Sequence, residues 1–117
     1  MSHTPRAHDD TVVVKEFHEV VNMSSSALKK WLDTDDSRRV GQKAAGSDES
    51  IGHRSGERIL KILEKSKDGL KADDYTHMQK VVSYVRRHMA QGPTVKNVAD
   101  SDWRFSLMNW GHDPLKK

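Results

Sequence analysis

The sequence predicts an all-α protein, a small orthogonal bundle of four to five helices behind a disordered N-terminal tail. Apolar residues recur at helical spacing in separate segments. No segment shows the sustained two-residue alternation of a half-buried strand. The 117 residues suffice for one core, and only 34% of them are hydrophobic. We therefore expect one domain at 11–117 after a tail at 1–10.

The N-terminal part of the chain predicts this tail and two helices. Residues 1–10 hold hardly any apolar side chain, so nothing there repays the entropy of ordering. A first helix is expected from Thr11 to about Asn22, and a second after Ser24, whose hydroxyl can cap it. The residues expected to face inward from these helices are Val13, Val14, Phe17, Val20, Val21, Leu28, Trp31 and Leu32.

The middle of the chain predicts one short turn and two longer helices. One helical turn is expected around Arg38, followed by a mobile loop at about 43–53. A third helix is predicted from about Ser55 to Lys65, with Gly69 in a left-handed conformation past its end, and a fourth from Ala72 to Gln91. Their expected inward residues are Ile59, Leu60, Ile62, Leu63, Tyr75, Met78, Val82, Val85 and Met89.

A last helix completes the predicted bundle. Ser101 or Asp100 can cap its start, and Gly111 closes it. It carries Trp103, Leu107 and Trp110 at core spacing. We interpret the tryptophans as packing anchors rather than as platforms on which bases stack.

The composition argues against a membrane-spanning segment, disulfide bonds and a metal site with cysteine ligands. The longest apolar run, Val12–Val14, is far short of the roughly 20 residues that a membrane span needs. The chain has no cysteine and its first ten residues lack a signal-peptide core. We therefore expect a cytoplasmic or nuclear protein with no membrane partner.

No pattern points to an enzyme, a metal site or a cofactor. His77 and His88 are eleven residues apart on one helix, hence about 16 Å apart, too far to share one ion. We interpret His53, His112 and Asp113 as solvated loop residues. No nucleophile elbow, phosphate loop or dinucleotide fingerprint occurs. A triad assembled from distant positions stays possible.

The positive charge is placed unevenly and forms two stripes. Up to Ser37 there are four basic and seven acidic residues, so the rest carries sixteen basic and ten acidic. The stripe on the third helix is Arg54, Arg58, Lys61 and Lys65, and that on the fourth is His77, Lys80, Tyr84 and Arg87. Cations with an interleaved aromatic suit a nucleic-acid surface. However, any amphipathic helix needs a polar outer face, and Glu57 and Glu64 flank the first stripe.

Several strings together resemble an uncharacterised microbial family, domain of unknown function 3140. They are Glu16-Phe17-His18, Trp31-Leu32-Asp33-Thr34, Ser37 with Val40-Gly41-Gln42-Lys43, Gly52-His53-x-Ser55-Gly56-x-Arg58-Ile59, His77-Met78-x-Lys80-Val81-Val82-x-Tyr84-Val85-x-Arg87-His88, and Trp103-Arg104-x-Ser106-Leu107-Met108-Asn109-Trp110-Gly111-His112-Asp113-Pro114. The resemblance implies no catalytic residues, and some members are labelled DNA-binding. Similar sequences tend to have a threonine at the position of Lys71, so the cap of the fourth helix is in question.

The resulting hypothesis is a non-enzymatic DNA-binding domain that contacts the phosphate backbone with little sequence preference. Its basic residues are those of the two stripes, with Arg38, Arg39 and Lys43 available from the neighbouring loop. The alternative is a protein-interaction module that uses the polar segments 53–56 and 109–114. The sequence leaves the natural partner and the oligomeric state open.

Overall fold

The computed structural model describes residues 10–41 and 51–116, and within these ranges the chain is all-helical. The predicted fold class is confirmed. The predicted tail, apart from Asp10, and residues 43–50 of the predicted loop lie outside the described residues. The elements are α1 (Asp10–Val20), α2 (Ser25–Leu32), α3 (Asp35–Arg39), α4 (Ile51–Glu64), the 3-10 turn η1 (Lys67–Gly69), α5 (Ala72–Gln91), the 3-10 turn η2 (Val98–Asp100) and α6 (Asp102–Asn109).

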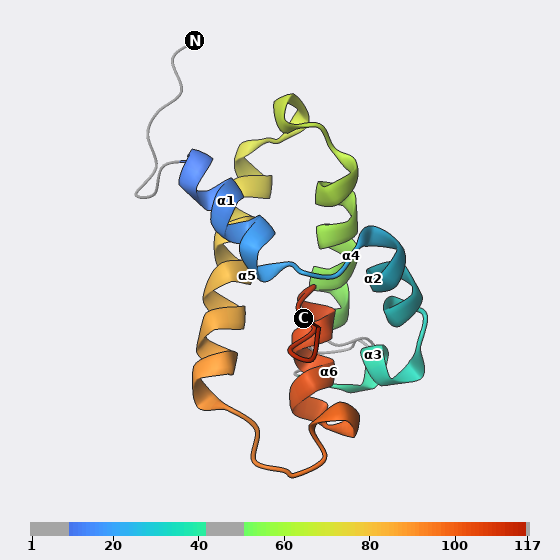
Figure 1. Ribbon diagram of the computed structural model, residues 1–117. Helices are drawn as coiled ribbons and strands as arrows, with labels where there is room; N and C mark the ends of the chain where they lie inside the picture. Colours follow the sequence, from blue (N-terminus) through green and yellow to red (C-terminus); the bar gives the residue numbers. More distant parts are fainter. Residues whose placement is uncertain (1–9, 42–50, 117) are drawn as a thin grey trace.

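The two long helices, α4 and α5, form opposite sides of the bundle, and the other helices fill and cover the space between them (Figure 1). α1 packs along α5, and α2 packs along α4. α6 contacts α2, α3, α4 and α5, so it joins the two sides. The position of α6 therefore decides which residues of α4 and α5 can meet.

The core takes at least one fully buried apolar side chain from each of the main helices. Phe17, Leu28, Ile59, Met78 and Leu107 come from α1, α2, α4, α5 and α6 and are at most 1% exposed. Burying a side chain of this size stabilises a fold by about 1.5–3 kcal/mol. The five helices therefore share a single core.

The tryptophans are packing residues, as predicted. Trp31 and Trp110 are buried, and Trp103 is half-buried. Trp31 also packs its ring against Phe105, with centroids 5.2 Å apart. None of the three indoles stands exposed on the surface.

Most helix ends form as the sequence predicts. Ser24 caps α2 by accepting a hydrogen bond from the Ala27 N–H at 3.1 Å. Ser101 caps α6 in the same way, accepting from the Arg104 N–H at 3.2 Å. α5 has the predicted bounds, and Gly92 ends it with a φ of 71°. Such a positive φ suits glycine because it has no Cβ to clash.

Three details of the prediction are wrong. α4 begins at Ile51 rather than near Ser55. The prediction missed its first turns because the residues that are buried there against α6 are small or polar, and a search for apolar periodicity does not detect them. Gly69 lies in η1 rather than in a left-handed cap, since α4 ends at Glu64 and the chain then enters the 3-10 turn. Met89 is 41% exposed because α1 covers only the first part of α5 (Figure 1).

Within the described residues, none of the helices is both long enough and apolar enough to cross a membrane.

Candidate functional site

The stripe on α4 lines an open depression that it shares with the start of α5. The buried carboxylate of Asp74 accepts hydrogen bonds from Lys65 Nζ at 2.7 Å and from the Lys71 N–H at 3.0 Å, and Arg58 lies 3.7 Å away. The hydrogen bond from Lys65 is the main cause that holds the pKa of Asp74 below its usual range. Asp74 therefore offsets part of the positive charge here. The depression, of about 430 Å³, is lined by Arg54, Glu57, Arg58, Lys61, Lys65 and Asp74.

Only half of the second predicted stripe faces solvent. Lys80 and Arg87 are exposed on α5, whereas the rings of His77 and Tyr84 are half-buried against α6. The placement of these two rings on an outward face is therefore wrong. Their spacing of seven residues puts them on one side of α5, and there the rings bury apolar area against Trp110.

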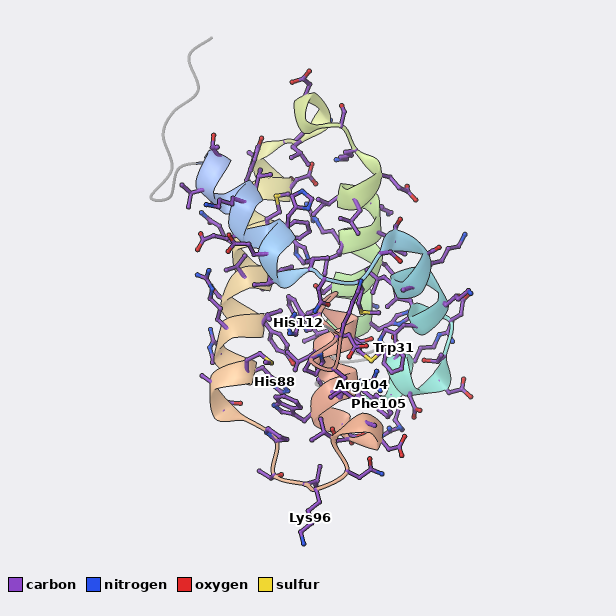
Figure 2. All side chains as sticks on the ribbon, viewed as in Figure 1. Trp31, His88, Lys96, Arg104, Phe105 and His112 are labelled. Atoms are coloured by element: carbon purple, nitrogen blue, oxygen red, sulfur yellow. The ribbon has the colours of Figure 1, made fainter. Side chains whose placement is uncertain are left out.

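The rings form a column between α5 and the C-terminal segment. His77 stacks on Trp110, Trp110 on Tyr84, Tyr84 on His88 and His88 on Trp103, with centroids 6.0, 4.3, 5.3 and 5.8 Å apart. Figure 2 shows His88 directed from α5 toward α6. The column fixes α6 at a defined distance from α5.

His77 brings the two stripes together. Its Nε2 lies 2.9 Å from the Ser55 hydroxyl, so it joins α5 to α4. Burial, followed by the nearby charges of Arg58 and Lys80, lowers the pKa of His77 to about 4. His77 is therefore neutral at pH 7, and the two cations that act on it come from different stripes.

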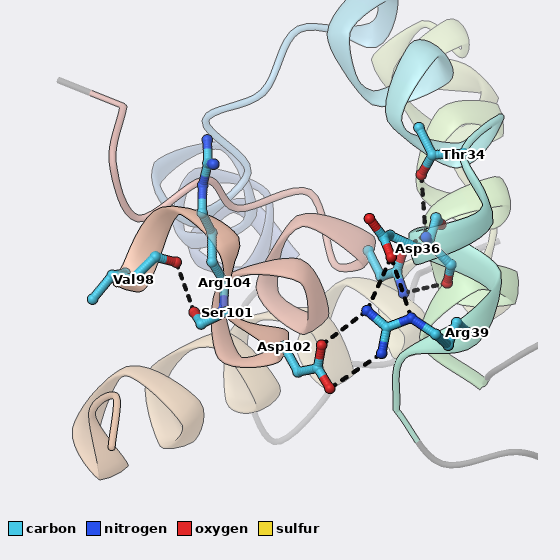
Figure 3. Close-up of polar contacts among 9 residues, drawn as sticks. Thr34, Asp36, Arg39, Val98, Ser101, Asp102 and Arg104 are labelled. Atoms are coloured by element: carbon cyan, nitrogen blue, oxygen red, sulfur yellow. Dashed lines mark hydrogen bonds and ion pairs between the residues drawn. The ribbon is translucent and has the colours of Figure 1, made fainter. Parts of the chain in front are cut away.

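Two of the three basic residues predicted to assist from the neighbouring loop, Arg38 and Arg39, are engaged elsewhere. Arg39 pairs with Asp36 and Asp102 at 2.9 and 3.0 Å, and Asp102 and Asp36 raise its pKa further above its usual range (Figure 3). Arg38 donates to the Asp33 carbonyl at 3.3 Å. Lys43 lies outside the described residues. Arg39 in particular links α3 to α6 instead of presenting a free charge.

A buried polar network holds α2, α3, α4 and α6 together. Asn109 Oδ1 accepts from Trp31 Nε1 at 2.8 Å and from Ser37 Oγ at 2.5 Å, while Asn109 Nδ2 donates to the Ser37 carbonyl at 2.9 Å. His53 Nδ1 lies 2.8 Å from Ser37 Oγ. Since the Ser37 proton points to Asn109, His53 must donate to Ser37 and cannot remove its proton. The Ser–His pair is therefore arranged for structure and not for nucleophilic attack.

The segments 53–56 and 109–114, where the sequence suggested polar loops, are largely used for packing. Segment 53–56 is helical and lies against α6, so its assignment to a loop is wrong. A Cβ on Gly56 would come within 2.6 Å of Leu32 Cδ2 and 2.7 Å of the Asn109 carbonyl oxygen. His112 Nδ1 lies 2.7 Å from the Val20 carbonyl, and Asp113 pairs with Arg104 at 2.9 Å.

A cleft opens where the start of α4, the middle of α5 and the end of α6 converge. Its volume is about 430 Å³. Trp110 and Tyr84 give it an aromatic wall, and Lys80 and Arg87 supply positive charge. Sequence reasoning identified Lys80, Tyr84 and Arg87 but missed the contribution of Trp110. The only signal for it was its place in the string Asn109-Trp110-Gly111. The cleft is lined by Val40, Gly41, Ile51, Gly52, Lys80, Ser83, Tyr84, Arg87, Ser106, Asn109 and Trp110.

The described residues form a small helical domain with a depression lined mostly by the basic residues of the α4 stripe and a separate cleft with an aromatic wall. A family model described as a protein of unknown function, DUF3140, matches residues 16–108. The chain therefore belongs to this family. Comparison with curated proteins and with solved structures gave no match.

Proposed function

We propose that this protein is a non-enzymatic DNA-binding domain whose cationic face contacts the phosphate backbone. The observation that supports the proposal is the 2.9 Å distance between His77 Nε2 on α5 and the Ser55 hydroxyl on α4, which brings together the two helices that carry the basic stripes. The proposal requires that both stripes engage one duplex together.

Five exposed basic residues are the proposed phosphate contacts. Lys61, Lys80 and Arg87 have no carboxylate within ion-pair distance among the described residues. Arg54 and Arg58 add to them from α4, although Asp74 offsets part of the charge of Arg58. His77 is neutral and Tyr84 is stacked, so neither counts as a contact. Binding would be driven by counterion release, with little sequence preference.

The test is fluorescence anisotropy of a labelled duplex of arbitrary sequence. Five phosphate contacts give a log–log salt slope of about −4.5, so affinity should fall about 500-fold between about 50 and 200 mM salt. Replacing Arg54, Arg58 and Lys61 by glutamine leaves two contacts, for which the loss is only about tenfold.

The matched control removes the same charge from elsewhere. Lys15, Lys29 and Lys30 are exposed on α1 and α2, and their replacement by glutamine should leave the salt slope unchanged. If the two triple variants lose affinity equally, net charge and not this face governs binding. If the unmodified protein does not bind at low salt, the proposal is wrong.

A protein-interaction role has less support from the described residues. In the segments proposed for it, polar side chains such as Asn109, Asp113 and His112 make hydrogen bonds or ion pairs within the protein. The buried Ser37–His53 pair likewise gives no reason to propose an enzyme. A DNA partner would place the protein in the cytoplasm or the nucleus.

A further inference from the structure

The aromatic cleft has chemistry that the DNA-binding face does not need. The cleft and the α4 depression are equal in volume, about 430 Å³ each, and both are cationic. The depression contains Glu57 and Asp74, which offset its positive charge. Among the described residues that line the cleft there is no carboxylate, so Lys80 and Arg87 are uncompensated there.

Trp110 leaves a buried hydrogen-bond donor at the wall of this cleft. The indole N–H of Trp31 donates to Asn109, and that of Trp103 donates to the His88 carbonyl. Trp110 is only 5% exposed, yet no acceptor among the described residues receives its N–H. A buried donor without an acceptor is costly, which makes an external acceptor the natural partner.

The donor belongs to a residue that lines the cleft. Nε1 of Trp110 is 3.2 Å from the point where a Cβ on Gly52 would lie, and both residues line the cleft. Because Gly52 has no side chain, only its backbone lies beside the N–H. The hydroxyl-bearing residues Ser83 and Ser106 line the same space.

The first turn of α4 adds to the positive potential. Ile51 and Gly52 border the cleft at the start of a 14-residue helix, whose N-terminal end favours negative charge. The charge of the cleft thus comes from two helices, α4 and α5.

We infer that the cleft binds a small organic phosphate, with the phosphate between Lys80 and Arg87, one ligand oxygen accepting from the Trp110 indole, and an apolar ring against the edges of the Tyr84 and Trp110 rings. Phosphate suits the site because it offers several acceptor oxygens to separate donors. The wall requires that the ligand also have an apolar part. This site shares Lys80 and Arg87 with the proposed DNA contacts, but it is tested without DNA.

The experiment titrates the ¹⁵N-labelled full chain with phenyl phosphate and follows the three indole N–H signals by NMR. The titration runs to about 10 mM, since a fragment of this size binds in the millimolar range. The Trp110 signal should shift and saturate, while those of Trp31 and Trp103, already hydrogen-bonded, stay in place. Inorganic phosphate, which lacks the ring, should bind about tenfold more weakly.

Adjacent arginines provide a matched pair of variants. Arg87→Gln removes a cation from the cleft and should weaken phenyl phosphate about tenfold. Arg86→Gln makes the same change one residue away, where the arginine pairs with Glu16 at 2.7 Å outside the cleft, and should change affinity less than about twofold. Equal losses in the two variants, or no saturable shift of Trp110, would overturn the inference.

A third variant separates this site from the DNA-binding face. Trp110→Phe removes the indole donor but keeps a ring in the column and every basic side chain on the surface. It should weaken phenyl phosphate about tenfold and leave affinity for the duplex unchanged. An unchanged phenyl phosphate affinity in a folded Trp110→Phe protein would show that the indole is not a ligand contact.

Discussion

Replacing Asn109 by alanine should destabilise the protein severely, because this one amide satisfies three buried groups. It accepts from Trp31 Nε1 and Ser37 Oγ, and it donates to the Ser37 carbonyl. Asn109 is 1% exposed and Ser37 is fully buried. Water cannot replace the lost partners without opening the contact between α3 and α6.

The size of the effect follows from the number of groups left unpaired. Each buried donor or acceptor without a partner costs about 1–3 kcal/mol. The three groups share one network, so their costs do not simply add, and we expect about 3–6 kcal/mol in the free energy of unfolding. A domain of this size is stable by only about 5–15 kcal/mol, so the variant should be close to unfolding.

Urea unfolding followed by circular dichroism measures this change. The control is Asn97→Ala, which removes an exposed asparagine whose side chain donates to Asp100 at 3.0 Å, and which should cost less than about 0.5 kcal/mol. If Asn109→Ala cost no more than Asn97→Ala, the network would not hold the helices together as argued.

Three further substitutions test other parts of the structure. Gly56→Ala should cost about 1–3 kcal/mol in urea unfolding, since the new methyl would meet Leu32 and the rigid Asn109 carbonyl; an unchanged midpoint would refute that close contact. The pKa of His77 is lowered from 6.5 in the unfolded chain to about 4 in the folded protein. As the pH falls below 6.5, the unfolded chain therefore takes up a proton that folded His77 does not. The folded protein is then less stable than above pH 6.5, and this loss is complete near pH 4. His77→Gln should therefore lose less stability between about pH 7 and pH 5 than the unmodified protein, and an equal loss would contradict the assignment. Lys71→Thr should stabilise the protein by about 0.5–1 kcal/mol in the same assay, because the Lys71 side chain forms no cap bond at an extended N-cap; a lower stability would show that the lysine has another role.

The helices could be predicted because their inward faces are apolar. Periodicity located α1, α2, α5 and α6 to within a residue or two, and capping residues such as Ser24 and Ser101 marked their starts. The first turns of α4 could not be predicted in this way, because glycine, histidine and serine face inward there. Those residues are buried through close backbone approach and hydrogen bonds, neither of which appears in a hydropathy pattern.

The charge of the site could be predicted only in part. Spacing correctly grouped the cations of α4, but the acid that offsets them, Asp74, lies on α5 and meets them only in the folded chain. In the same way, nothing in the sequence shows that Arg39 is paired across to Asp102. A stripe of basic residues therefore gives an upper limit on the charge that a partner meets.

Two of the strings that resemble the family, Gly52–Ile59 and Trp103–Pro114, meet in the structure, and their meeting explains how the cleft arises. Gly52 and Gly56 let α6 approach α4 so closely that a Cβ on either residue would press on Asn109. His53 and Asn109 then close the buried network with Ser37, which holds that approach in place. Because the glycine closest to Trp110 has no side chain, the indole N–H is left at the wall of the cleft. The glycines that allow α6 to pack tightly against α4 thus also leave room beside the donor on which the proposed ligand site depends.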